Sequence, residues 1–299
     1  MGNNPFAGCP KLTLQNESPY FLLEDGVLYD REKKNLIYYP IKDTRKEFAV
    51  PEGVICLGKH CFYACDHLEH ITIPASVIRF ENNPFSGCTK LRLTCNTPYY
   101  IVENGVIYNK FKTTIIGCLN GSQIDYLTVP ESVTLISRNS FWNCKGVKKI
   151  VLSKNIDRIG YNPFAGCENL RIENGGNPNF YIENGIVFDK KRTHLLCATD
   201  RAVGTAYRVP DGVTHINRGV FSGCPGLREI DFGRVTYIDK SSFTNCTGLT
   251  ELYIPDVVTY IGEWAFSYCT NLRKISINKK TFVDKNAFNE CPVSIEWRE

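Results

Sequence analysis

The chain has 299 residues, 43% of them hydrophobic, and its 35 Lys and Arg nearly balance its 31 Asp and Glu, for a formal net charge of +4. A net charge this small does not indicate a nucleic-acid partner, because such partners need a strongly basic surface. The sequence has no run of 18 apolar residues, so we expect no transmembrane segment in this chain.

Phe followed three residues later by Cys recurs from one end of the chain to the other. Successive copies lie 22 or 23 residues apart, or 56 or 57 apart where an insert of about 33 residues lengthens the interval. The nine copies begin at Phe6, Phe62, Phe85, Phe141, Phe164, Phe221, Phe243, Phe266 and Phe288. A period of this length predicts a repeat protein, in which stacked turns bury one continuous core.

In chain order, a first turn begins at Asn4 and an insert follows it at about 18–48. Two further inserts lie at about 97–127 and 177–207. Each insert contains Asp-Gly or Asn-Gly between two short β-prone runs, a pattern that predicts a β-hairpin. A third apolar run follows in each insert. We therefore expect three small β-meanders that project from the same side of the protein.

The turns between the inserts carry the pattern Leu-x-x-Ile-x-Ile-Pro, as at Leu68, Ile71 and Ile73. The alternation predicts a short strand with one buried face, and the Pro ends the strand or bends the chain. The Ala-Phe-x-x-Cys part is too short for a stable helix and predicts a single helical turn. From Asp211 to Cys291 the turns run without inserts, and we expect residues 292–299 to form a capping strand.

The complete pattern, represented between Leu249 and Cys269, resembles the BspA-type leucine-rich repeats of bacterial surface proteins. The resemblance extends over essentially all 299 residues. It implies a single leucine-rich repeat domain over 1–299, a β-rich solenoid of short parallel strands with single helical turns or irregular segments on its other side. It also implies a secreted or surface-attached protein for adhesion and interaction.

The chain contains 14 cysteines, nine of them at the repeat position, whose phase places them in the core. Their side chains would run parallel from turn to turn, so we expect reduced thiols that act as small apolar groups. The chain also starts inside a turn. We therefore expect the native N-terminus, with any signal peptide or anchor, to lie upstream of Met1.

Residues 53–59 match the first seven positions of a phosphate-binding loop, but His60 stands where Ser or Thr should bind magnesium. This segment also keeps the repeat phase, so we predict no nucleotide or other cofactor. A neighbouring group has the residue types of a zinc site, but its Cys should face the core while His70 faces outward. We predict no metal at this group, which comprises His60, Cys61, Cys65, His67 and His70.

The outward positions of the short strands form the predicted binding surface. On a curved solenoid these positions line the concave face, which is the usual binding face of such repeats. Their mixed charge argues against a polyanionic ligand. The predicted binding residues are His70, Thr72, Lys149, Val151, Glu229, Asp231, Glu251, Tyr253, Lys274 and Ser276.

No catalytic motif is found, and the five His residues are scattered along the chain. We therefore predict a noncatalytic, monomeric binding module that is secreted or on the cell surface. Its strand face and insert hairpins would contact a protein or glycan ligand. Two alternatives stay open: a glycan-active enzyme domain, which needs two convergent carboxylates roughly 5 to 10 Å apart, and a passive spacer that displays another domain.

Overall fold

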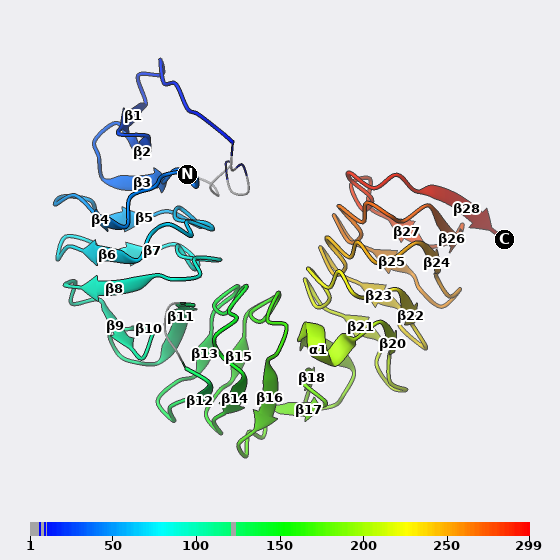
Figure 1. Cartoon of the computed structure of the whole chain (residues 1–299). Coiled ribbons are helices and arrows are strands. Elements are labelled where there is room, and N and C mark those ends of the chain that lie inside the picture. Colours follow the sequence, from blue (N-terminus) through cyan, green and yellow to red (C-terminus); the bar gives the residue numbers. More distant parts are fainter. Residues whose placement is uncertain (1–5, 7–8, 10, 121–123) are drawn as a thin grey trace. The chain divides into compact units, whose positions relative to one another are not determined.

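The computed structural model describes residues 6, 9, 11–120 and 124–299. The chain divides into two compact units, residues 1–148 and 149–299. Each unit is a stack of repeat turns with its own apolar core (Figure 1). This stack of short parallel strands is the solenoid that the repeat predicts. The assignment of 1–299 to a single domain stays a prediction.

Each turn contributes one strand to a first row and a second, shorter strand to a second row. In unit 1 the first row holds β4 (Glu47–Ala49), β6 (His70–Ile73), β8 (Arg92–Cys95) and β12 (Tyr126–Thr128). In unit 2 it holds β14 (Lys149–Leu152), β16 (Arg171–Asn174), β20 (Ala206–Arg208), β22 (Glu229–Asp231), β24 (Glu251–Tyr253), β26 (Lys274–Asn278) and β28 (Ser294–Arg298). Neighbouring first-row strands that pair do so in parallel, for example β24 with β26 and β26 with β28.

The second row consists of strands of two residues each. In unit 1 these are β5 (Cys56–Leu57), β7 (Arg79–Phe80) and β13 (Leu135–Ile136). In unit 2 they are β15 (Arg158–Ile159), β21 (His215–Ile216), β23 (Tyr237–Ile238), β25 (Tyr260–Ile261) and β27 (Phe282–Val283). The last four pair in parallel, so their side chains align from turn to turn.

Each insert forms a three-stranded antiparallel meander. The strands are β1 (Phe21–Glu24), β2 (Val27–Asp30) and β3 (Asn35–Tyr38), then β9 (Tyr100–Glu103), β10 (Val106–Asn109) and β11 (Thr114–Cys118), then β17 (Phe180–Glu183), β18 (Ile186–Asp189) and β19 (His194–Ala198). The third strand of each pairs in parallel with a second-row strand. The meanders therefore do not project as separate units; they extend the second row, because Leu36 and Leu195 occupy its buried position.

The repeat Phe residues form the centre of each core. Those from Phe62 to Phe266 are 1% exposed or less, whereas Phe6 and Phe288 are half-buried. The segment that follows each Phe is a hydrogen-bonded turn rather than the expected helical turn. The N–H of Cys246, for example, donates to the carbonyl of Phe243 at 3.2 Å. The residue before the Cys, here Asn245, has a positive φ of 62°, which stops a helix from continuing.

All 14 cysteines are free, and those of the repeat are buried with two exceptions. Cys291 is half-buried, and Cys9 is exposed, contrary to the predicted inward placement. Both belong to turns at the ends of the chain, where a core position has a neighbouring turn on one side only. Among the described residues the one helix is α1 (Asp200–Val203), which has four residues and ends the third insert.

Candidate functional site

The ten predicted binding residues all lie on the outward side of first-row strands. His70, Thr72, Lys149, Val151 and Ser276 are half-buried, and the other five are exposed. Two of the ten belong to unit 1 and eight to unit 2. Within unit 2 the register places Glu251 beside Lys274 and Tyr253 beside Ser276. We call these eight residues of unit 2 the strand face.

Much of the charge on this strand face is already paired across neighbouring strands. Lys149 Nζ lies 2.8 Å from Glu173 and Lys274 Nζ lies 2.9 Å from Glu296. The Arg298 guanidinium carbon sits 4.0 Å from the centre of the Tyr253 ring, which is still 58% exposed. A ligand at this surface would have to compete with these contacts. The energetic cost of breaking them is small, because exposed ion pairs contribute little to stability.

A row of stacked rings on the second strand row was not predicted from the sequence. It consists of His194, His215, Tyr237, Tyr260 and Phe282, one each from β19, β21, β23, β25 and β27. Successive ring centres lie 4.3, 5.4, 4.3 and 5.3 Å apart, and the ring planes are within 26° of parallel. We call this row the aromatic ladder. Its rings cover one another's faces and present their edges to solvent.

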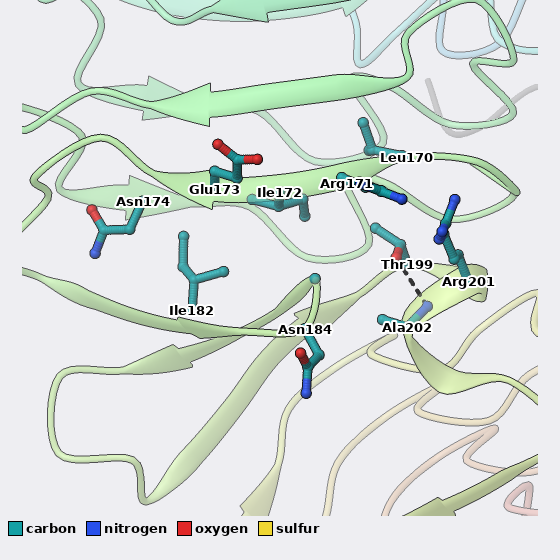
Figure 2. A pocket seen from close by; sticks show the side chains of 11 residues that line it. Leu170, Arg171, Ile172, Glu173, Asn174, Ile182, Asn184, Thr199, Arg201 and Ala202 are labelled. Carbon is teal, nitrogen blue, oxygen red and sulfur yellow. Dashed lines mark hydrogen bonds between the residues drawn. The ribbon is translucent and has the colours of Figure 1, made fainter.

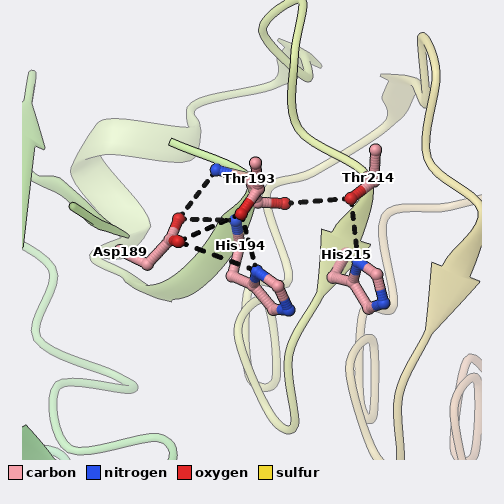
Figure 3. A network of polar contacts seen from close by, with 5 residues as sticks. All are labelled: Asp189, Thr193, His194, Thr214 and His215. Carbon is pink, nitrogen blue, oxygen red and sulfur yellow. Dashed lines mark hydrogen bonds and ion pairs between the residues drawn. The ribbon is translucent and has the colours of Figure 1, made fainter. Parts of the chain in front are cut away.

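A threonine precedes every ring of the aromatic ladder. Two of these threonines, Thr193 and Thr214, orient the two imidazoles, as Figure 3 shows. The Thr193 hydroxyl donates to Asp189 Oδ2 at 3.0 Å and also lies 2.9 Å from His194 Nδ1. Because a hydroxyl has one proton, Nδ1 must be the donor in the second bond. The exposed Nε2 of neutral His194 is therefore an acceptor.

The same arrangement recurs one turn later. The Thr214 hydroxyl donates to the Thr193 carbonyl at 3.4 Å and lies 2.8 Å from His215 Nδ1. Burial and the neighbouring His194 lower the pKa of His215, so its neutral form is favoured. The outward edge of the aromatic ladder thus offers two imidazole acceptors followed by two tyrosine hydroxyls.

Comparisons with known proteins identify the repeat. A family model for the BspA type leucine rich repeat region, in six copies, matches residues 42–116, 101–188 and 205–296. These segments make up more than half of the chain. The chain belongs to the BspA-type leucine-rich repeat family.

Solved structures of leucine-rich repeat proteins show a similar fold. A leucine-rich repeat protein from Eubacterium ventriosum is 22% identical, with a TM-score of 0.53 over 89% of this chain and 72% of its own. A leucine rich cell surface protein from Faecalibacterium prausnitzii is 19% identical, with a TM-score of 0.50 over 94% of this chain and 87% of its own. No curated protein sequence matches this chain.

Packing between the BspA-type turns accounts for the residues that resemble a phosphate-binding loop and a zinc site. A Cβ added to Gly58 would lie 2.9 Å from the Leu36 carbonyl, so this glycine permits close contact between turns. His60 is buried with its Nδ1 3.0 Å from the Ser86 hydroxyl, and Cys61 faces the core. Within the described part of the chain, no three His, Cys, Asp or Glu side chains gather as metal ligands. No helix in that part is long and apolar enough to cross a membrane.

The aromatic ladder is not a requirement of the BspA-type repeat. In unit 1 the same second-row position is held by Asn35, Cys56, Arg79, Thr114 and Leu135. The ladder does have a signature in the sequence, a Thr followed by His, Tyr or Phe in five successive turns of unit 2. Hydrophobic periodicity does not detect it, because the position is only half-buried in most of these turns.

Proposed function

We propose that this chain is a noncatalytic binding module of a secreted or cell-surface protein, and that unit 2 contacts a protein ligand through the strand face and the aromatic ladder. Repeat solenoids commonly bind through extended rows of outward side chains. The related protein from Faecalibacterium prausnitzii is described as a leucine rich cell surface protein, which supports the location.

The aromatic ladder is the observation that carries this proposal. Tyr and His each present an apolar body and a polar tip, and Tyr is among the residues enriched at protein interfaces. Five successive turns of unit 2 place such a ring, or Phe, at a position where unit 1 has Asn, Cys, Arg, Thr and Leu. The fold tolerates all these residues there, so the rings serve something beyond the core.

Ring orientation favours a protein over a glycan. Sugars bind aromatic side chains by stacking on a ring face, but spacings of 4.3 to 5.4 Å leave no room between these rings. Apart from Phe282, which ends the row and is 58% exposed, what remains accessible is a line of ring edges with imidazole and hydroxyl groups. These groups can hydrogen-bond to a protein surface. A glycan ligand is the alternative outcome of the same experiment.

An array of purified extracellular proteins and of glycans, probed with labelled protein, tests this function. The variant is Tyr237→Leu/Tyr260→Leu, because Leu135 already occupies the equivalent position in unit 1. We expect binding to at least one protein, reduced at least tenfold in the variant. Lys154→Ala, an exposed substitution outside the aromatic ladder, is the control and should bind as the wild type. Absence of binding on both arrays would favour the passive spacer, and equal binding of both variants would exclude the aromatic ladder.

A further inference from the structure

A slot lies beside β16, the last strand of its sheet. The hollow has a volume of about 700 Å³, and one wall is Leu170–Asn174, which includes the whole of β16. The opposite wall comes from the third insert and α1 (Figure 2). Its residues are Ile182, Asn184, Gly185, Thr199, Arg201 and Ala202. Among the described strands of unit 2, β16 pairs with β14, and its other edge faces this slot.

The slot exists because the third insert follows β16 directly, so no described first-row strand of the next turn pairs with the free edge of β16. The next first-row strand, β20, begins a separate sheet with β22. An open strand edge carries unpaired backbone N–H and C=O groups that can pair with another chain. Peptide recognition by strand addition uses such an edge.

The first insert forms a similar hollow in unit 1, although residues 12–14 there are not in a strand. That hollow has a volume of about 650 Å³ and is lined by Leu12–Leu14, the Asp25-Gly26 turn and Lys42, among others. Lys42 follows the paired residue Tyr38 by four positions, as Arg201 follows Cys197. A hollow with a basic residue beside the insert thus occurs at the first and the third insert.

Charge along the β16 slot defines the occupant. Arg171 and Arg201 are both exposed, and neither has an ion-pair partner among the described residues. Figure 2 shows both side chains at the same end of the slot, with Glu173 toward the other end. Glu173 is already paired with Lys149 at 2.8 Å. The open end is therefore positive and lacks the carboxylate that two arginines would bind.

First-row strands elsewhere supply such a carboxylate from the neighbouring strand. Lys149 on β14 and Lys274 on β26 lie 2.8 and 2.9 Å from Glu173 and Glu296 of the next strand. Arg171 holds the same outward position on β16 as these lysines hold on their strands, but in the described part of the chain no next strand pairs with β16. An added strand with an acidic residue near Arg171 would supply such a carboxylate.

We propose that the β16 slot binds an extended segment of the protein ligand, which adds a strand to β16 and places an acidic side chain between Arg171 and Arg201. The segment has an apolar residue next to the acidic one, since alternate residues of an added strand face the core side, here Ile172. This site rests on the proposed binding of a protein ligand and is separate from the aromatic ladder.

A synthetic peptide with the sequence of residues 249–255 of this chain is a suitable probe. It carries Glu251 at the outward position and Leu252 at the inward one, as β24 does. We expect fluorescence anisotropy to show binding of this peptide. Arg171→Glu should weaken binding at least tenfold, and a peptide with Lys in place of Glu251 should bind that variant better than it binds the wild type. Arg234→Glu is the matched control, because Arg234 is exposed and lies outside both the slot and the strand face.

Two further measurements separate strand addition from simple charge attraction. Peptide binding should slow hydrogen exchange of the β16 amides, and N-methylation of alternate peptide amides should abolish binding. Undetectable binding at millimolar peptide, or binding that N-methylation and Arg171→Glu leave unchanged, would overturn the proposal. The ladder variant Tyr237→Leu/Tyr260→Leu should bind the peptide normally. Loss of the slot alone would leave the proposed function intact, whereas failure of that function appears on the protein array.

Discussion

The rings of Phe243 and Phe266 lie parallel within 5°, with their centres 5.0 Å apart. This separation is close to the distance of about 4.8 Å between neighbouring strands. Phe221 continues the stack on one side and Phe288 on the other. The repeat therefore places the same buried ring in each turn, and the strand spacing alone brings the rings into contact.

Truncation of one ring in this stack should be costly. Phe221 is fully buried and lies 4.9 Å from Phe243, so Phe221→Ala leaves a cavity between neighbouring turns. We expect a loss of about 3 to 5 kcal/mol in the free energy of unfolding, measured by denaturant titration. Phe282→Ala, at a ring that is 58% exposed, should cost less than about 1 kcal/mol. Equal costs for both variants would show that the buried stack is not the source of stability.

Buried His60 should make unit 1 less stable in acid. Burial, together with the charge of Lys59, lowers the pKa of His60 to about 4. In the unfolded chain the pKa is about 6.5, so between these values the unfolded state alone binds the proton. Stability should therefore fall by about 3 kcal/mol as the pH drops from 6.5 to 4, with no effect of this group above pH 6.5.

The variant His60→Asn removes this titration, and Asn tolerates the positive φ of 53° at this position. Urea titrations at pH 7 and pH 4 should show a smaller difference for the variant than for the wild type. The change in the free energy of unfolding between the two pH values is compared for each protein. Any loss of stability that the substitution causes equally at both pH values therefore cancels. Identical pH dependence in both proteins would mean that folding does not change the pKa of His60.

The thiols should react in two classes. Cys9 is exposed, whereas burial raises the pKa of Cys269 to about 12 and that of Cys291 to about 11. Thiolates are the reactive form, so at pH 8 a thiol reagent should modify Cys9 first. Cys9→Ser should remove the fast phase. In denaturant all 14 thiols should react. A lower total without reductant would reveal a disulfide and contradict the free thiols of this structure.

The sequence predicted the parts of the fold that depend on burial. The period of Phe62, Phe85 and the later copies identified the core, because stacked turns must bury the same position each time. The alternation at Ile71 and Ile73 identified the first-row strands for the same reason. The turn before each Cys was harder to predict, because Tyr268 and Glu290 take the left-handed conformation that Gly223 takes at the same point. Tertiary context imposes it on residues that do not favour it.

The two surface features were missed for different physical reasons. The aromatic ladder lies at half-buried positions, where neither burial nor exposure constrains the residue type, so periodicity did not detect Tyr237 or Tyr260. The β16 slot depends on a strand that is absent, and its position required knowledge of how the third insert rejoins the second row. The ten outward residues lie on first-row strands, and their role in binding stays a prediction. Their cross-strand pairs, such as Lys274 with Glu296, required coordinates.

The most direct test of the account is to measure stability and ligand binding together on Tyr237→Leu/Tyr260→Leu. If the aromatic ladder is a contact surface, the variant should lose about 1 to 2 kcal/mol of stability from its cross-strand ring pairs. It should remain folded and bind the array-identified protein ligand at least tenfold more weakly. A variant that loses as much stability as Phe221→Ala while binding with unchanged affinity would show that the rings hold the turns together and do not contact the ligand.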